Sequence, residues 1–382
     1  MPILSADYLF DGETYLPSNT VLQVSDKGVI EAIFQTDNKT DVEVYEGLLM
    51  PGMINAHCHL ELSHMQNQIS EGKGLVAFLL GILAQRTLMR ADDIQTAIAK
   101  AEASMLANGI VAVGDISNTL DTLPQKARQQ LHYQTFVVCL GLKEEKAMDI
   151  FLQAKKMQSQ FALYGNSSLA LHAPYTLSHR LIKLVNEDGK GQVTTIHNQE
   201  CEAENELFMH RTGDFLSLFE AVHFNINDFI TAQKNSLQTY LPLMEQAQPL
   251  ILVHNTVTTT EDIAFAQATG KQLYWCLCPN ANLYIEGRLP NIPLMLQAGC
   301  TLVLGTDSLA SNHSLSIWDE IKTIRTHYPE IALETMLQWA CINGAQALGM
   351  DASLGRFAIG KQPGVVYIPD FHHANSTPCK LY

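Results

Sequence analysis

Two histidines near the start of the chain, His57 and His59, are separated by one residue and follow the apolar segment 50–54, which contains a Pro-Gly pair. In an extended strand, alternate side chains project to the same side, so the two imidazoles would face one point. Neutral imidazole is a good ligand for divalent cations such as zinc and ferrous iron. Because a His-x-His pair also occurs without a metal, it predicts a metal site only together with ligands elsewhere in the chain.

Other ligand-type residues lie at the ends of later strand-like segments. His197 is followed by Glu200, His254 ends an apolar run, and Asp307 follows a Gly-Thr pair. Taken singly, each has an ordinary explanation, since a strand-end histidine is often a hydrogen-bonded core residue and Gly-Thr-Asp can be a turn. In a parallel barrel, however, the carboxyl ends of the strands converge on one mouth, where active sites are found. Together with the His-x-His pair, these residues therefore predict one site.

Segment 50–350 alternates short apolar strands with longer helical stretches, which is the pattern of βα units around a parallel sheet. Helices are expected between the strands, for example at residues 91–107, 144–160, 177–187, 261–267 and 292–298. The strands are expected at residues 53–59, 110–115, 135–142, 168–172, 193–197, 250–254, 273–278 and 301–307. These units predict an α/β fold, a (β/α)₈ barrel of the TIM type. A doubly wound sheet is the alternative, but it does not explain why so many strands end in potential ligands.

Both ends of the chain differ from this central part. Residues 3–47 form short alternating strands separated by turn residues, and Gly355, Gly360 and Gly364 interrupt the apolar residues near the C-terminal end. Neither end could bury much apolar surface alone, so we expect them to meet in one small β-sandwich domain. The predicted domains are therefore residues 1–49 with 352–382 for the β-sandwich, and residues 50–351 for the metal-dependent barrel.

Composition limits the possible partners and the location of the protein. Hydrophobic residues make up 47% and charged residues 16% of the 382, as in a globular enzyme. The formal net charge of −15 argues against a nucleic-acid partner. No apolar run reaches the roughly 18 residues that span a bilayer, so we expect no membrane association and a cytoplasmic location. The eight cysteines contain no Cys-x-x-Cys pair and are expected to be reduced. A homodimer is left open.

These features resemble the amidohydrolase superfamily over nearly the whole chain. Closer still, three segments are similar to its deaminase and chlorohydrolase branch, namely Leu171-His172-Ala173-Pro174-Tyr175-Thr176, Cys278-Pro279-Asn280-Ala281-Asn282-Leu283 and Gly305-Thr306-Asp307-Ser308-Leu309-Ala310-Ser311-Asn312. The resemblance implies a hydrolase that acts on a carbon–nitrogen bond of a small molecule. It implies metal ligands at His57, His59, His197 and Asp307, with Glu200, His254 and Asp307 as catalytic residues.

The number of metals follows from a residue that is absent. Superfamily members with two metals usually bridge them with a carboxylated lysine at the end of an inner strand. Here the fourth strand ends in His172 instead. Lys143, after the third strand, is the rival position, yet its charged neighbours indicate a solvated helix start. We therefore expect one divalent transition metal, with zinc favoured and ferrous iron left open. The ion would lower the pKa of a bound water, Asp307 would accept its proton, Glu200 would protonate the substrate ring, and His254 would orient the attacking oxygen.

Three shorter segments are residues 57–63, residues 196–206 with 213–215, and residues 311–316 with 319–320. They resemble the aminodeoxyfutalosine deaminases of menaquinone biosynthesis, which suggests an adenine-type nucleoside, 6-amino-6-deoxyfutalosine, as the substrate. Deaminases of methylthioadenosine or adenosylhomocysteine share the segment that begins at His172, and there the histidine contacts the ribose. Glu61 is a second candidate for substrate binding, through a sugar hydroxyl or a more distant polar group, unless its carboxylate only orients a ligand histidine or pairs with an arginine. A cyclic amide hydrolase and a non-catalytic barrel scaffold are the alternatives from other classes.

Overall fold

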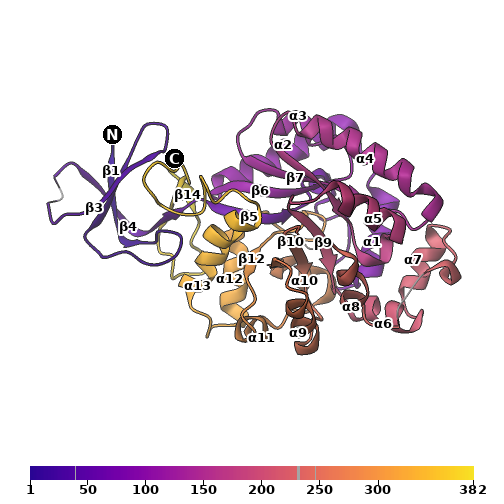
Figure 1. Ribbon diagram of the computed structural model, residues 1–382. Helices are drawn as coiled ribbons and strands as arrows, with labels where there is room; N and C mark the ends of the chain where they lie inside the picture. Colours follow the sequence, from indigo (N-terminus) through magenta and orange to yellow (C-terminus); the bar gives the residue numbers. More distant parts are fainter. Residues whose placement is uncertain (39, 230–232, 246) are drawn as a thin grey trace.

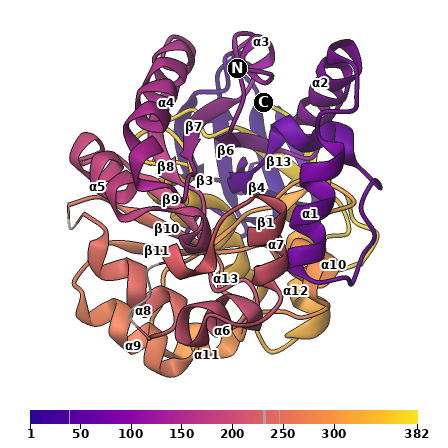
Figure 2. The same cartoon turned by 90° about the vertical axis from the view of Figure 1, so that its right-hand side faces the viewer.

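Eight parallel strands form the centre of the computed structural model, which describes residues 1–382 except 39, 230–232 and 246. Helices surround these strands (Figure 2). The strands are β5 (Met53–Cys58), β6 (Ile110–Ser117), β7 (His132–Cys139), β8 (Asn166–Leu171), β9 (Thr194–Asn198), β10 (Leu250–His254), β11 (Leu273–Leu277) and β12 (Leu302–Leu304). Every strand expected from the sequence is therefore present, although several ends are shifted by a few residues.

Hydrogen bonds group these strands into two four-stranded parallel sheets, in the orders β5-β6-β7-β8 and β12-β11-β10-β9. The links between the sheets include an isolated bridge from Cys58 to Asp307 at one seam. At the other seam, the backbone N–H of His197 donates to the carbonyl of His172 at 3.0 Å. The α/β class and the parallel strands are thus confirmed. The expected closure of the barrel is not confirmed, because the described strands do not form one continuous hydrogen-bonded ladder.

The strands are buried on both faces, which explains why they read as apolar runs in the sequence. In β10, Leu250 and Leu252 pack in one core cluster, while the intervening Ile251 and Val253 pack in another. Helices cover the outer face of a parallel sheet, so both faces of each strand select apolar side chains. The polar strand ends are consequently the places where chemistry can occur.

The helices connect the strands in the expected alternation. They are α1 (Leu75–Gln85), α2 (Ala91–Ala107), α3 (Leu123–Lys126), α4 (Ala147–Phe161), α5 (His179–Asp188), α6 (Glu202–His210), α7 (Phe215–Ala221), α8 (Ser236–Tyr240), α9 (Thr260–Ala268), α10 (Pro279–Glu286), α11 (Ile292–Gln297), α12 (Ile317–His327), α13 (Leu333–Gln338) and α14 (Gly344–Ala347). Short helical turns are η1 (Leu60–Met65), η2 (Glu144–Lys146), η3 (Pro174–Thr176), η4 (Ile226–Asp228), η5 (Leu241–Leu243) and η6 (Trp339–Asn343). The helix expected at 91–107 is confirmed with both its ends, and the one expected from residue 144 begins instead with the turn η2.

Both ends of the chain meet in a separate six-stranded sheet, on the left of Figure 1. Its order is β14-β13-β4-β1-β2-β3, made of β1 (Ile3–Leu9), β2 (Thr20–Val24), β3 (Ile30–Gln35), β4 (Val42–Pro51), β13 (Val365–Ile368) and β14 (Cys379–Lys380). The expected meeting of the termini is therefore observed. The β-sandwich is not confirmed, because these strands form one sheet whose apolar side packs on side chains such as Phe357. The domain boundaries at 49/50 and 351/352 stay a prediction.

Two simpler expectations can also be compared with the structure. None of the helices in the described part of the chain is long and apolar enough to cross a membrane. All eight cysteines are free thiols, as their spacing predicted.

Candidate active site at the carboxyl ends of the strands

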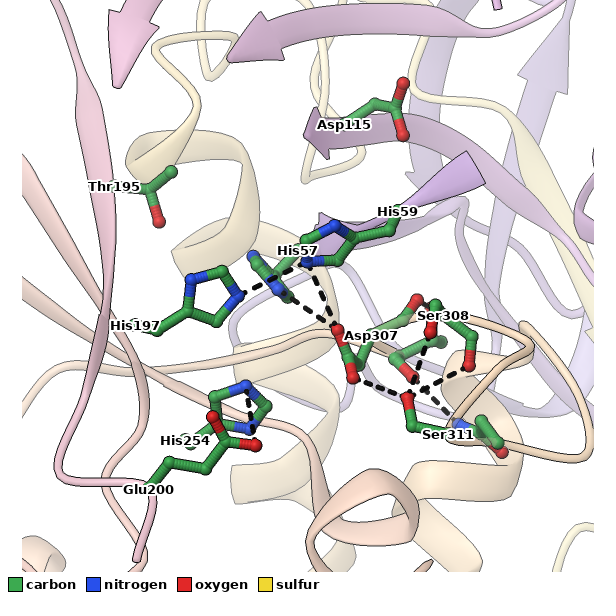
Figure 3. A network of polar contacts seen from close by, with 12 residues as sticks. His57, His59, Asp115, Thr195, His197, Glu200, His254, Asp307, Ser308 and Ser311 are labelled. Carbon is green, nitrogen blue, oxygen red and sulfur yellow. Dashed lines mark hydrogen bonds and ion pairs between the residues drawn. The ribbon is translucent and has the colours of Figure 1, made fainter. Parts of the chain in front are cut away.

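Four side chains expected as metal ligands, His57, His59, His197 and Asp307, converge where the strands end (Figure 3). One ligand atom from each lies within 4.8 Å of the others. The Nε2 atoms of His57 and His59 lie 3.4 and 3.3 Å from Oδ1 of Asp307, and Nε2 of His59 lies 3.3 Å from Nε2 of His197. All four residues are buried.

The backbone turns sharply where these strands end. Gln199, His254 and Asp307 have φ angles of 44°, 75° and 56°, in the left-handed region that residues other than glycine rarely adopt. Such strained conformations persist only where surrounding contacts impose them, and they concentrate at functional sites. Here the turns direct side chains from β9, β10 and β12 toward the same point.

A glycine allows the first and last strands to approach each other. A Cβ atom on Gly305 would lie 2.8 Å from Cβ of His57 and 2.9 Å from Sγ of Cys276, so no larger residue fits. The carbonyl of His57 accepts hydrogen bonds from the backbone N–H groups of Thr306 and Asp307, at 3.0 and 3.2 Å. This close contact holds His57 and Asp307 against each other although 250 residues separate them in the chain.

The hydrogen bonds of the histidines leave lone pairs that suit a cation. Nδ1 of His197 donates to the carbonyl of His172 at 2.6 Å, so Nε2 carries the lone pair. His57 is fully buried, and neither of its ring nitrogens has a hydrogen-bond partner among the described residues. A tetrahedral site with bonds of about 2.0–2.1 Å separates its ligand atoms by about 3.4 Å. The three distances of 3.3–3.4 Å given above are close to this value. The residues present therefore fit a divalent metal such as zinc.

Asp307 is held in its ionised form by its neighbours. Burial favours the protonated acid, but the contact with His57 and the electrostatic interactions with the rings of His59 and His254 hold the pKa of Asp307 well below its usual range. Its other oxygen, Oδ2, accepts a hydrogen bond from the Ser311 hydroxyl at 2.5 Å. One carboxylate oxygen thus faces the histidines while Ser311 fixes the other.

Glu200 and His254 form a second pair beside this cluster, with Oε1 of Glu200 3.6 Å from Nε2 of His254 (Figure 3). Burial, reinforced by the negative charges of Asp307 and Glu204, raises the pKa of Glu200 well above its usual range, which favours the protonated acid. Burial lowers the pKa of His254 to about 4, so its ring is neutral at pH 7. Asn282 donates to Nδ1 of His254 at 3.4 Å, which leaves the proton on Nε2.

A cavity of about 410 Å³ opens above these residues, and both candidate substrate-binding residues line it. Nδ1 of His172 contacts the Thr176 hydroxyl at 3.2 Å, and burial lowers the pKa of His172 to about 4. Glu61 accepts hydrogen bonds from the backbone N–H groups of Asn118 and Thr119 and pairs with Arg86 at 3.4 Å. The arginine pairing considered from the sequence is therefore present, and protein donors already occupy both oxygens of Glu61.

Several supporting residues were not found from the sequence. Ser311 lies in a segment noted only for its family resemblance, and its contact with Asp307 is made between residues four apart in a loop. Glu204 accepts from the backbone N–H groups of Gln199 and Glu200 at 3.2 and 3.1 Å. Its four-residue spacing from Glu200 was a possible signal. Lys143, the rival position for a bridging lysine, is exposed just before η2, as expected for a solvated helix start.

Comparisons with known proteins agree with this geometry. The model of the amidohydrolase family matches residues 48–377. The chain is 27% identical over 314 residues to an adenosine deaminase of Helicobacter pylori, covering 80% of this chain and 75% of that one. It is 26% identical over 320 residues to an aminodeoxyfutalosine deaminase of Deinococcus radiodurans, covering 79% and 73%.

The fold is also that of a solved structure. The crystal structure of the Helicobacter pylori aminofutalosine deaminase in complex with methylthio-coformycin superimposes with a TM-score of 0.84, at 21% identity, covering 99% of this chain and 97% of that one. At this identity the superposition establishes the fold. With the family match over most of its length, the chain belongs to the amidohydrolase family and is a hydrolase that acts on carbon–nitrogen bonds.

Proposed function

We propose that this protein is a metal-dependent deaminase that converts the ring amine of a 5′-extended adenine nucleoside to a carbonyl and releases ammonia. The observation that carries the proposal is the convergence of four ligand-type side chains beside a cavity that Glu200, His254 and three of the four ligands line. Relatives named as deaminases of adenosine and aminodeoxyfutalosine support the nucleoside class.

One divalent ion would be held by His57, His59, His197 and Asp307, with zinc as the first choice and ferrous iron as the alternative. When bound, such an ion supplies a water molecule whose pKa is near neutrality. Three nitrogens and one carboxylate are a donor set that suits either metal. His172 follows β8, and Lys143, the rival position for a bridging lysine, is exposed before η2, which supports a single ion.

The proton transfers are assigned to this chain's own residues. Asp307, ionised and fixed by Ser311, accepts the proton of the attacking water. Glu200, which burial keeps protonated, donates to the ring nitrogen next to the reacting carbon. The neutral His254 donates from Nε2 and orients the attacking oxygen. A carbon–oxygen bond forms, the carbon–nitrogen bond of the amine breaks, and ammonia leaves with the proton from Asp307. The proton of the remaining hydroxyl returns to Glu200 as the carbonyl forms.

The residues that line the cavity help to distinguish among adenine nucleosides as substrates. His172 is our first candidate for a contact with the sugar, and Glu61 is the second, although a sugar hydroxyl would have to share its oxygens with Asn118, Thr119 and Arg86. Apolar residues of α1 and α7, such as Phe78 and Phe219, line the cavity, and so do the cationic residues Arg86, Lys143 and Lys146. The acidic residues among those that line the cavity are Glu61, which pairs with Arg86, and the two residues of the catalytic cluster, Glu200 and Asp307.

This distribution favours a 5′ substituent that is apolar or anionic. The ammonium group of adenosylhomocysteine would meet, among the described residues that line the cavity, only the carboxyl groups of Glu61, Glu200 and Asp307, which already have partners or catalytic roles, and burying an unpaired charge is costly. We therefore propose 6-amino-6-deoxyfutalosine as the substrate, which would place the enzyme in menaquinone biosynthesis, in the cytoplasm. Methylthioadenosine, whose extension is small and apolar, is the second candidate.

The test is an ammonia-release assay on the zinc-loaded protein, with 6-amino-6-deoxyfutalosine, methylthioadenosine, adenosylhomocysteine, adenosine, guanine and an aminotriazine at equal concentrations. We expect the highest kcat/KM for the first and the lowest nucleoside value for adenosylhomocysteine. Faster turnover of guanine or the triazine than of any adenine nucleoside would contradict the nucleoside assignment. A cyclic amide is measured alongside to test the alternative of a cyclic amide hydrolase. Ring opening of this amide, without ammonia release from any of the amines, would make the protein an amide hydrolase.

A further inference from the structure

A buried ion pair lies next to the site but outside the cavity. Nζ of Lys126, at the end of α3, lies 2.5 Å from Oδ2 of Asp115 on β6, and the two side chains are 2% and 0% exposed. Neither residue is among those that line the cavity. Nζ of Lys126 also donates to the hydroxyls of Ser117 and Thr135, at 3.2 and 3.0 Å. All its hydrogen-bond partners thus come from β6 and β7.

The pair is connected directly to the His-x-His segment. Oδ1 of Asp115 accepts a hydrogen bond from the backbone N–H of Leu60 at 2.9 Å, and Leu60 follows His59. Cys58, which precedes His59, is the register partner of Asp115 in the pairing of β5 with β6. Asp115 and His59 are both labelled in Figure 3. The carboxylate therefore holds the chain at the point where β5 ends and turns into η1.

The energetics of this arrangement point to a role in positioning. Removing two charges from water is costly, so a buried ion pair adds little to stability and an apolar pair of the same size is often as stable. Lys126 also packs on the rings of Tyr133 and Phe161, at 5.0 and 4.5 Å from their centroids, so part of its surroundings is apolar. What an apolar pair could not do is accept the hydrogen bond from Leu60.

We propose that Asp115 and Lys126 form a positioning device for His59, in which Lys126 orients the carboxylate of Asp115 and Asp115 fixes the backbone that carries the ligand. The inference rests on the metal site of the proposed function. Partners of this kind, beyond the ligands themselves, typically change metal affinity by about 10–100-fold when they are removed. Neither residue contacts the substrate cavity, so the effect should appear in metal binding before it appears in chemistry.

The test compares two double variants that both lack the buried charges. Asp115→Asn with Lys126→Met keeps an oxygen that can accept from Leu60, whereas Asp115→Leu with Lys126→Met removes it. Zinc dissociation constants are measured by competition with a chelator, and melting temperatures on the same preparations. We expect the asparagine variant to bind zinc within about 3-fold of the parent and the leucine variant to bind it 10–100-fold more weakly. Equal zinc affinity in the two variants overturns the proposal, even where both melting temperatures fall.

Two controls separate the possible causes. Lys155→Met breaks the Lys155–Asp188 pair between α4 and α5, at 2.9 Å, and should leave the zinc affinity unchanged. His59→Ala should weaken zinc binding strongly, and full affinity in that variant would show that the metal site itself is assigned wrongly. A further measurement is made on the parent protein, so that it does not depend on whether a variant folds. The Leu60 amide should be protected from hydrogen exchange in the zinc-free protein, and exchange at the rate of a free loop amide would contradict the proposal.

Discussion

At the scale of single residues, the partners of each side chain decide which atom remains for chemistry. His197 uses Nδ1 to bond a backbone carbonyl and Asp307 uses Oδ2 to accept from Ser311, so Nε2 and Oδ1 remain to face the ligand cluster. His57 has no hydrogen-bond partner for either nitrogen among the described residues. A buried polar atom without a partner is costly, and a bound cation would offset that cost.

The first prediction concerns this cluster. The purified protein should contain about one divalent transition metal per chain, and His57→Ala and Asp307→Ala should each lose it, because each removes a proposed ligand. Metal analysis after dialysis measures the content. His313→Ala, at an exposed histidine that pairs with Glu71, is the control and should keep its metal. Full metal content in both ligand variants would remove the site.

The second prediction separates acid catalysis from metal binding. Glu200→Gln keeps the size of the side chain but removes its acidic proton. We therefore expect kcat to fall by roughly 10²–10⁴-fold, with unchanged metal content and melting temperature. All three quantities are measured on one preparation. Near-normal kcat with full metal would exclude the proton-donating role, and loss of metal would instead make Glu200 a ligand or the support of one.

At the scale of elements, the turn from β9 into α6 sets the position of Glu200. Gln199 adopts a φ of 44°, and Glu204 on α6 accepts from the N–H groups of Gln199 and Glu200. The Ser236 hydroxyl donates to the same carboxylate. Burial raises the pKa of Glu204 to about 7. The catalytic candidate is therefore held by its own backbone and by a side chain one helical turn further along.

The third prediction tests this support. Glu204→Gln replaces one acceptor oxygen by a donor, so at least one of its hydrogen bonds is lost and Glu200 is less well placed. We expect kcat to fall roughly 10-fold, the equivalent of one net hydrogen bond, with little change in KM or metal content. Glu206→Gln, at an exposed position of the same helix, is the matched control. A fall in melting temperature with unchanged kcat would reduce Glu204 to a structural residue.

At the scale of the whole molecule, the strand ends collect neutral histidines in a buried site. Burial lowers the pKa of His172 and of His254 to about 4, below the ordinary value of 6.5. A depressed histidine pKa contributes stability above pH 6.5, and this stability is lost as the pH falls toward 4. The raised pKa values of Glu204, about 7, and Glu320, about 8, act in the opposite direction over part of this range.

The fourth prediction therefore uses a difference between two proteins. In the metal-stripped state, the free energy of unfolding of the parent relative to His172→Gln should fall by roughly 1.4 kcal/mol per pH unit between pH 6.5 and about 4.5, since one neutral histidine must take up a proton. Urea titrations at several pH values measure it. A parallel pH dependence of the parent and His172→Gln would contradict the assignment of His172 as a buried neutral group.

The pattern of strand ends could be predicted because it is local. An apolar run followed by a histidine or an aspartate identifies both a buried strand and the polar residue at its end, so the eight strands and the converging residues were found. Strand ends were less accurate, as in β7, which begins at His132 and not at residue 135. The expected β-sandwich was not confirmed, because alternation within strands does not reveal how many sheets the strands will form.

The sequence by itself determined the alternation of strands and helices, the ligand-type residues and their order along the chain, since these depend on neighbours a few positions apart. The tertiary structure decided which side chains support them. Asp115 with Lys126, Glu61 with Arg86, and Ser311 with Asp307 are contacts made by particular turns and loops. Such contacts depend on how the chain bends between elements, and that is fixed only when packing brings all the strand ends to one mouth.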